Sequence, residues 1–252
     1  MPATQKLLGI RFFDGNVAEA VDQAIANGGL IVAPSGTCFT RLQQDETYRH
    51  AMISADLALP DSGFMVLLWH LLHCRRITRI SGLTYLKELL ARLDLRSAGS
   101  TVWVLPNAGA REKTVAALAR DGFSISETDC YVAPMYGREP EDEALLAFLA
   151  ARRPRHIVIA LSGGVQEKLG FHVREQCGYR PAIHCIGAAL GFVAGYQIAI
   201  PDWADRLYLG WLLRLLSQPG KFLPRALNAL ALPGLIMKCG EKLPPMKKSR
   251  VS

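Results

Sequence analysis

The chain has 252 residues, half of them apolar and a fifth charged, which is typical of a folded globular protein and excludes a disordered or collagen-like one. Its net charge is +7, but +6 of this lies beyond residue 200, so the first 200 residues carry only +1. A nearly neutral body excludes a general polyanion binder, so we expect no nucleic-acid partner, whereas the basic end predicts a local anionic partner.

Cysteine usage and hydropathy indicate the compartment. The six cysteines form no Cys-x-x-Cys pair, which argues against a zinc knuckle or a dithiol redox site and favours free thiols in a reducing cytoplasm. The first eight residues do not resemble a secretory signal. The longest apolar stretches fall well short of the ~20 residues that a membrane-spanning helix needs. We therefore expect a cytoplasmic protein that is soluble or lies on a membrane surface.

Short β-branched apolar runs alternate with helix-period segments over the first 186 residues. Buried strands are expected at Leu30–Ala33, Leu57–Pro60, Thr101–Leu105, His156–Leu161 and Ala182–Ile186. Amphipathic helices are expected at Val17–Ala26, Phe64–His73, Leu83–Leu95, Ala110–Arg120, Glu141–Ala151 and Val165–Gln176. This alternation predicts an α/β fold, in which helices cover both faces of a parallel sheet.

Beyond Pro201 the pattern becomes helical only. One segment places Trp and Leu residues at a helical spacing, and a second apolar and basic segment covers Phe222–Cys239. We expect an α/β domain over residues 1–200, a basic and apolar helical appendage over 201–240 and a flexible basic tail over 241–252. The appendage suits a helix lying in an anionic membrane interface, and equally helices that pack on the sheet or on another subunit of a homo-oligomer.

Ligands of parallel sheets bind at the carboxyl ends of the strands, where the chain turns into the next helix. The candidate binding residues are therefore those that follow the expected strands: Ser35, Thr37, Asp61, Asn107, Gly109, Ser162, Gly163, Gly164 and Gly187.

Asp61 is the candidate with the clearest chemistry. It follows a strand and precedes Ser62-Gly63 and an apolar helix. A carboxylate that points into the ligand crevice can take a proton from a hydroxyl group. The alternative is that Asp61 is the N-cap of that helix and accepts a backbone hydrogen bond.

A glycine pair and an arginine are candidates for binding an anion. Ser162-Gly163-Gly164 leads into a helix, whose free N–H groups suit a phosphate, although a tight strand-to-helix turn explains two glycines equally well. Arg79 precedes another helix and can clamp a phosphate or carboxylate, or lie at the surface. The Gly-x-Gly-x-x-Gly and Walker signatures are absent, which argues against a dinucleotide oxidoreductase and an NTPase. The histidines and carboxylates show no convincing metal-ligand spacing, so we expect no metal site.

Several motifs, taken in order, resemble the WecG/TagA/CpsF family of inverting bacterial glycosyltransferases. The resemblance covers about Gly9 to Arg225. It rests on these motifs: Ala55-Asp56, Leu59-Pro60-Asp61, Arg79-Ile80-Ser81-Gly82-Leu83, Gln166-Glu167-Lys168, Phe192-Val193-Ala194-Gly195, Pro201-Asp202-Trp203, Gly210-Trp211-Leu212-Leu213-Arg214-Leu215 and Gln218-Pro219.

The resemblance implies a Rossmann-like body with a C-terminal helical appendage. It implies transfer of a sugar, such as N-acetylmannosamine, its uronic acid or glucose, from a UDP donor to a polyprenyl-diphosphate-linked saccharide in cell-surface polysaccharide synthesis. The enzyme would be metal-independent, use no cofactor and be peripheral on the inner face of the cytoplasmic membrane. The resemblance further implies that Asp61 is the general base, Arg79 an anion contact and Gln166 a neighbour of the sugars. It places Arg206 and Arg214 near the diphosphate.

The chain also departs from the family pattern. Its Ala33-Pro34-Ser35 stands where the family has Thr-Pro-Asn, Leu190-Gly191 replaces Phe-Asp, and Ala199-Ile200-Pro201 replaces Arg-Ala-Pro. These departures motivate a second hypothesis, a non-catalytic sugar-nucleotide-binding or scaffold protein in a polysaccharide assembly complex.

Overall fold

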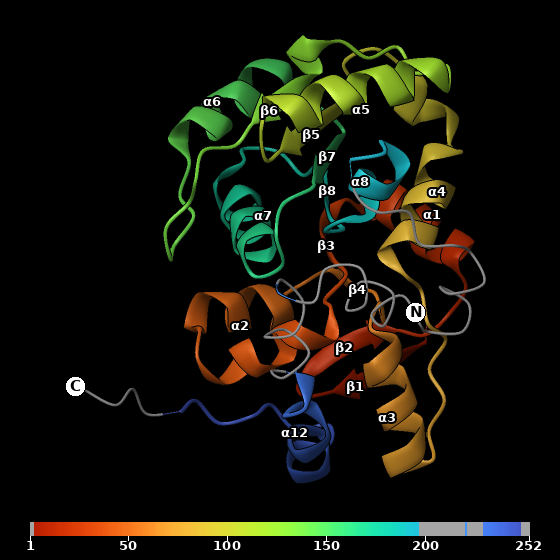
Figure 1. Cartoon of the computed structure of the whole chain (residues 1–252), viewed down its shortest axis with the longest axis vertical. Helices are drawn as coiled ribbons and strands as arrows, with labels where there is room; N and C mark the ends of the chain where they lie inside the picture. Colours follow the sequence, from red (N-terminus) through yellow and green to blue (C-terminus); the bar gives the residue numbers. More distant parts are fainter. Residues whose placement is uncertain (1–2, 197–219, 221–228, 248–252) are drawn as a thin grey trace.

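Within residues 3–196, 220 and 229–247, which the computed structural model describes, eight strands form one sheet in the order β1-β2-β4-β3-β8-β7-β5-β6 (Figure 1). The strands are β1 Thr4–Leu7, β2 Ile10–Phe13, β3 Gly29–Val32, β4 Leu57–Ala58, β5 Thr101–Leu105, β6 Cys130–Val132, β7 His156–Ile159 and β8 Ala182–Cys185. All neighbours pair in parallel except β1 and β2. The predicted α/β class is confirmed, and the five strands predicted from the sequence are all present.

The sheet begins with an antiparallel hairpin that was not predicted from the sequence. Leu7 of β1 pairs with Ile10 of β2, and the turn residues Leu8 and Gly9 have φ values of 50° and 83°. Positive φ at both central positions suits a two-residue hairpin turn, because its twist matches that of the strands. A side chain at Gly9 would also clash with Leu243, since its Cβ would lie 2.7 Å from that of Leu243. The sheet is therefore mixed at this edge and not wholly parallel.

Helices cover both faces of the sheet, as predicted (Figure 1). One face packs against α1 Val17–Asn27, α4 Gly82–Leu90, α5 Ala108–Arg120 and α8 Ala189–Val193. The other packs against α2 Glu46–Ile53, α3 Gly63–His73, α6 Glu143–Arg152, α7 Val165–Gln176 and α12 Leu232–Cys239. Alternate strand residues serve the two cores: Leu30 and Val32 of β3 face the α7 side, and Ile31 faces the α4 side.

Three 3-10 helices complete the described elements, and two helices differ from the prediction in their bounds. They are η1 Gly36–Gln43, η2 Leu93–Arg96 and η3 Glu127–Asp129. The helix expected at Leu83–Leu95 ends at Leu90 and is followed by η2. The helix expected from Glu141 begins instead at Glu143, because Asp142 caps it by accepting a hydrogen bond from Leu145 N (2.9 Å).

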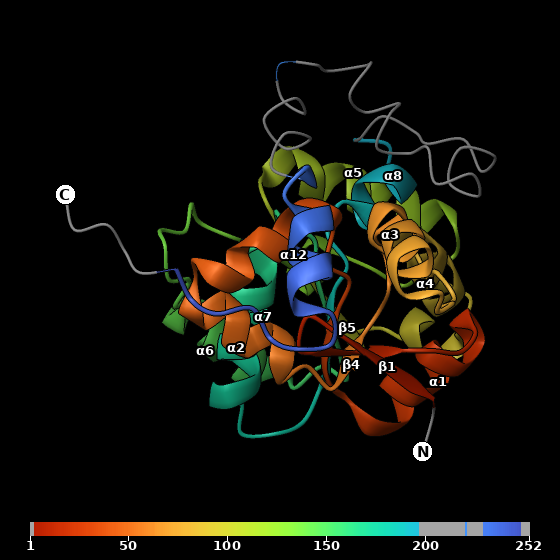
Figure 2. The same ribbon diagram turned by 90° about the horizontal axis from the view of Figure 1, so that it is seen from below.

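The described part of the C-terminal region lies against the body. Leu232 and Ile236 of α12 are fully buried, and Figure 2 shows α12 between α2 and α3. After α12 the backbone of Gly240 and Glu241 accepts hydrogen bonds from Leu8 and Gly9 at the hairpin turn (2.8 and 3.0 Å). Residues 241–247, expected as the start of a flexible tail, are thus hydrogen-bonded to the body at one end, and Lys247 N donates to Gln43 O at the other.

The remainder of the expected appendage, residues 201–219 and 221–228, lies outside the described residues, as do residues 197–200 of the expected α/β domain. The division of the chain at residues 200 and 240 stays a prediction. Among the described helices none is long and apolar enough to cross a bilayer.

Candidate functional site

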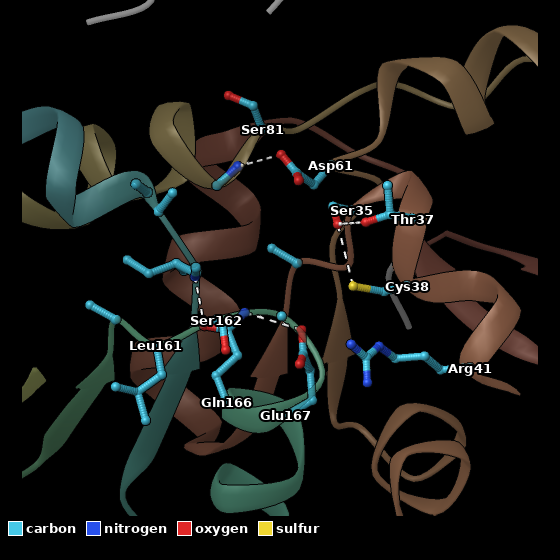
Figure 3. Close-up of a pocket in the computed structure, with 18 of the residues that line it drawn as sticks. Ser35, Thr37, Cys38, Arg41, Asp61, Ser81, Leu161, Ser162, Gln166 and Glu167 are labelled. Atoms are coloured by element: carbon cyan, nitrogen blue, oxygen red, sulfur yellow. Dashed lines mark hydrogen bonds between the residues drawn. The ribbon is translucent and has the colours of Figure 1, made fainter. Parts of the chain in front are cut away.

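A cleft of about 770 Å³ opens at the carboxyl end of the sheet (Figure 3). Its lining includes the residues that follow four neighbouring strands: Ser35 after β3, Asp61 after β4, Ser162 after β7 and Gly187 after β8. Strands β3 and β8 are adjacent, and the chain leaves them towards opposite faces, into η1 and α8. Ligands of α/β sheets bind at such a crevice. The cleft therefore lies where the sequence predicted it.

Most of the predicted site residues line this cleft. Those that do are Ser35, Thr37, Asp61, Arg79, Ser162, Gly163, Gln166 and Gly187. Asn107 does not, because it caps α5 by accepting a hydrogen bond from Ala110 N (2.9 Å). Gly109 lies within α5 and Gly164 is buried in the turn before α7, and neither is in the lining. Arg206 and Arg214 are outside the described residues.

The Asp61 carboxylate points to the start of α4. Its Oδ1 accepts a hydrogen bond from the backbone N–H of Gly82 (2.9 Å), the first residue of that helix. The N-cap of α3 is Ser62, whose Oγ accepts from Met65 N (3.2 Å). The alternative that Asp61 itself caps α3 is therefore wrong. A carboxylate at the N-terminus of a helix is stabilised by the free N–H groups and by the helix dipole.

Arg79 is held beside Asp61. Its Nε donates a hydrogen bond to the backbone carbonyl of Asp61 (2.9 Å), and the side chain, half-buried, lines the cleft. Ser81 caps α4 by accepting from Thr84 N (3.1 Å). The predicted base and the predicted anion contact thus belong to one hydrogen-bonded unit at the start of α4.

The three residues of the Gln166-Glu167-Lys168 motif are all buried, and each binds a different part of the chain. Gln166 Oε1 accepts from Gly187 N (2.7 Å), which ties α7 to the loop after β8. Glu167 accepts from Gly164 N (2.5 Å) and from Gln166 Nε2 (3.1 Å). Lys168 Nζ forms an ion pair with Asp45 Oδ2 (3.0 Å), the N-cap of α2. The motif therefore ties α7 to the loop after β8, to the glycine turn and to the start of α2.

Glu167 is a carboxyl group at the floor of the cleft. Desolvation by burial raises its pKa above the ordinary value, and the hydrogen bonds from Gln166 and from Gly164 N, together with the charge of Arg41, act in the opposite direction. Because Gly164 N donates to Glu167, this amide of the glycine turn is already used inside the protein.

The glycine pair itself is explained by close approach of η1. A Cβ on Gly163 would lie 2.9 Å from Cys38 Sγ, and one on Gly164 would lie 2.8 Å from Arg41 Cζ. Cys38 and Arg41 are three residues apart in a 3-10 helix and so lie on the same side of it. Gly164 also has a φ of +92°, which side chains rarely adopt. The tight-turn alternative thus accounts for both glycines without a phosphate.

Sequence reasoning missed most of the η1 side of the cleft, of which it named only Thr37. Cys38 and Arg41 line it together with Thr40, Gln43 and Gln44. The buried residues of η1, Cys38, Phe39 and Leu42, recur at a helical spacing, but the segment is short and was not among the helices expected from the sequence. Burial and the negative charge of Glu167 raise the pKa of the Cys38 thiol, which lies 3.3 Å from Ser35 Oγ.

The described part of the cleft brings together the groups for an acid–base displacement on an anionic substrate. Figure 3 shows Asp61 and Arg41 at the two ends of one side of the cleft, with Ser35, Thr37 and Cys38 between them. A carboxylate can accept a proton, hydroxyl groups can orient a polyhydroxy ligand, and guanidinium groups can bind phosphate. Among the described residues no cluster of three or more His, Cys, Asp and Glu is arranged to hold a metal ion.

Comparison with known proteins gives one family. The model of the glycosyl transferase WecG/TagA/CpsF family matches residues 5–245, nearly the whole chain. A search of curated proteins gives no match.

Proposed function

From the premise that the chain belongs to the WecG/TagA/CpsF family of glycosyl transferases, we propose that it moves a sugar from a UDP donor to a polyprenyl-diphosphate-linked saccharide with inversion, and that Asp61 is the general base. The family implies glycosyl transfer in cell-surface polysaccharide synthesis. The donor, the acceptor and the base are our proposal.

The observation that carries the proposal is the position of Asp61. Its carboxylate lines the cleft and is oriented by Gly82 N, 2.9 Å from Oδ1. In the proposed step, this carboxylate takes the proton from an acceptor hydroxyl as the hydroxyl oxygen attacks the anomeric carbon. The bond from that carbon to the UDP oxygen breaks, and UDP leaves with the bonding electron pair from the opposite face, which inverts the configuration.

Charge that develops on the leaving diphosphate needs positive groups near it. We assign Arg79 to this task, because it lines the cleft next to Asp61. Arg206 and Arg214 are proposed to join it from the appendage. Gln166 would act by positioning, since its amide is hydrogen-bonded to Gly187 N and to Glu167. The proposal includes no metal ion and no cofactor.

The proposed acceptor is a lipid, so we propose that the protein works as a peripheral protein on the inner face of the cytoplasmic membrane. The support is the charge distribution, because +6 of the net +7 lies beyond residue 200 among Trp and Leu residues.

The test is a turnover assay with the purified full chain, a panel of UDP-sugars and a synthetic polyprenyl-diphosphate-linked saccharide, with and without EDTA. Formation of a glycosylated lipid of inverted anomeric configuration, unaffected by EDTA, is the expected result. Binding of UDP-sugars without transfer to any lipid-linked acceptor would contradict catalysis and favour the scaffold alternative. Transfer abolished by EDTA and restored by a divalent cation would contradict metal independence.

A further inference from the structure

Arg41 is a cationic side chain of the cleft that has no counter-ion within hydrogen-bond distance among the described residues, although its charge acts on the buried carboxyl group of Glu167. It is exposed and lines the cleft, and it makes no hydrogen bond or ion pair with any residue that the structure describes. By contrast, the buried Lys168, on the same side of the sheet, is paired with Asp45 at 3.0 Å.

The guanidinium lies face-on to the glycine turn before α7. A Cβ built on Gly164 would lie 2.8 Å from Cζ and 2.9 Å from each of Nε and Nη1 of Arg41. Nearly equal distances to three atoms of a planar group mean that Gly164 faces the plane of the guanidinium and not its edge. The N–H groups of the guanidinium lie in that plane, so they do not point at Gly164 and are left available to a ligand.

Two further features make this position suitable for an oxyanion. The hydroxyl groups of Ser35 and Thr37, 3.1 Å apart, follow β3 along the same wall of the cleft, and the exposed Ser162 begins the glycine turn opposite them. A guanidinium fork with hydroxyl donors nearby is the arrangement that binds a phosphate with two parallel hydrogen bonds. The packing of Gly164 against Arg41 holds the fork at this wall.

We propose that Arg41 is the anchor of a diphosphate subsite on the η1 wall of the cleft, which binds the diphosphate of the sugar-nucleotide donor. The inference rests on the proposed function, since it takes the donor to be a nucleoside diphosphate sugar. It adds a binding residue that no sequence motif marked, on the wall formed by η1 and the glycine turn, so that Arg41 would hold the diphosphate from this wall and Arg79 from the side of Asp61.

The test is calorimetric titration of the full chain with UDP, with uridine and with inorganic pyrophosphate. The variants are Arg41→Gln, Arg41→Lys and the matched control Arg120→Gln, an exposed arginine in the last turn of α5 outside the cleft. Because Arg41 is exposed and makes no hydrogen bond to a described residue, Arg41→Gln should fold, which its thermal unfolding checks.

We expect Arg41→Gln to weaken the binding of UDP about 10- to 100-fold, since it removes charge-assisted hydrogen bonds, and to weaken pyrophosphate binding as well. The affinity of Arg41→Gln for uridine and the affinity of Arg120→Gln for UDP should equal the wild-type values. Arg41→Lys, which retains the charge, should lose less affinity for UDP than Arg41→Gln.

Wild-type affinity of Arg41→Gln for UDP, or an equal loss of its affinity for uridine, would overturn the subsite. If the wild-type chain binds pyrophosphate through Arg41 but no UDP, the subsite stands and the UDP donor is wrong. Binding of neither ligand by the wild type would overturn the subsite.

Discussion

The carboxylate of Asp61 and the backbone N–H of Gly82 are joined by a hydrogen bond of 2.9 Å. Two more bonds connect the same segments, from Arg79 Nε to Asp61 O (2.9 Å) and from Ile80 N to Pro60 O (3.3 Å). The loop after β4 and the start of α4 therefore form one unit, although α3 separates them in the sequence. The orientation of the candidate base depends on α4 and not on the helix that directly follows it.

Gly164→Ala should lower the free energy of unfolding by about 1–3 kcal/mol, because alanine at a φ of +92° is strained and its Cβ would meet the Arg41 guanidinium. Gly137→Ala is the matched control, since nothing lies within 4 Å of its Cβ position, and it should change stability by less than about 0.5 kcal/mol. Urea denaturation measures both. Equal stability of the two variants would show that η1 does not press on the glycine turn.

Lys168→Met should destabilise the protein by about 3–5 kcal/mol, because it leaves the carboxylate of Asp45 buried without its cation. Lys113→Met, an exposed lysine on α5, should cost less than about 0.5 kcal/mol. Chemical denaturation of both variants provides the comparison. A loss below about 1 kcal/mol for Lys168→Met would mean that Asp45 is satisfied by other groups.

His184 should make stability fall at mildly acidic pH. Burial first, and then the charge of the neighbouring His156, hold the pKa of His184 well below 6.5, so the unfolded chain binds a proton that the folded chain rejects. The contribution of the neutral His184 to the free energy of unfolding is complete above pH 6.5 and is lost as the pH falls towards the pKa of the folded state. From His184 alone we expect the free energy of unfolding to fall by about 1.4 kcal/mol between pH 7.5 and 5.5.

The measurement is urea denaturation from pH 7.5 to 5.5 on the wild type and on His184→Asn, which retains hydrogen-bonding groups for Tyr85 but does not titrate. The free energy of unfolding of His184→Asn should depend less steeply on pH than that of the wild type, whatever its value at pH 7.5. Parallel curves for the two proteins would mean that His184 is protonated in the folded state or does not contribute.

The sequence predicted the location of the cleft but not most of its η1 wall, and the reason is physical. Parallel strands share a carboxyl edge, so the residues after β3, β4, β7 and β8 had to meet once the strands were recognised. The hairpin at residues 4–13 was missed because β1 is not an apolar run: three polar residues, Thr4, Gln5 and Lys6, precede its one buried residue, Leu7. The contacts of Cys38 with Gly163 and of Arg41 with Gly164 are tertiary, so the glycine pair was noticed in the sequence but its partners in η1 were not.

The most direct test of the account is transfer by Asp61→Asn beside the matched variant Asp121→Asn, an exposed aspartate at the end of α5. Asparagine is nearly isosteric, and its side-chain oxygen can still accept from Gly82 N, so the fold and the affinity for UDP should persist. Loss of the base predicts a fall in the transfer rate to the lipid-linked acceptor of at least about 100-fold, with Asp121→Asn at the wild-type rate. Transfer by folded Asp61→Asn at the wild-type rate would contradict the assignment of Asp61 as the general base.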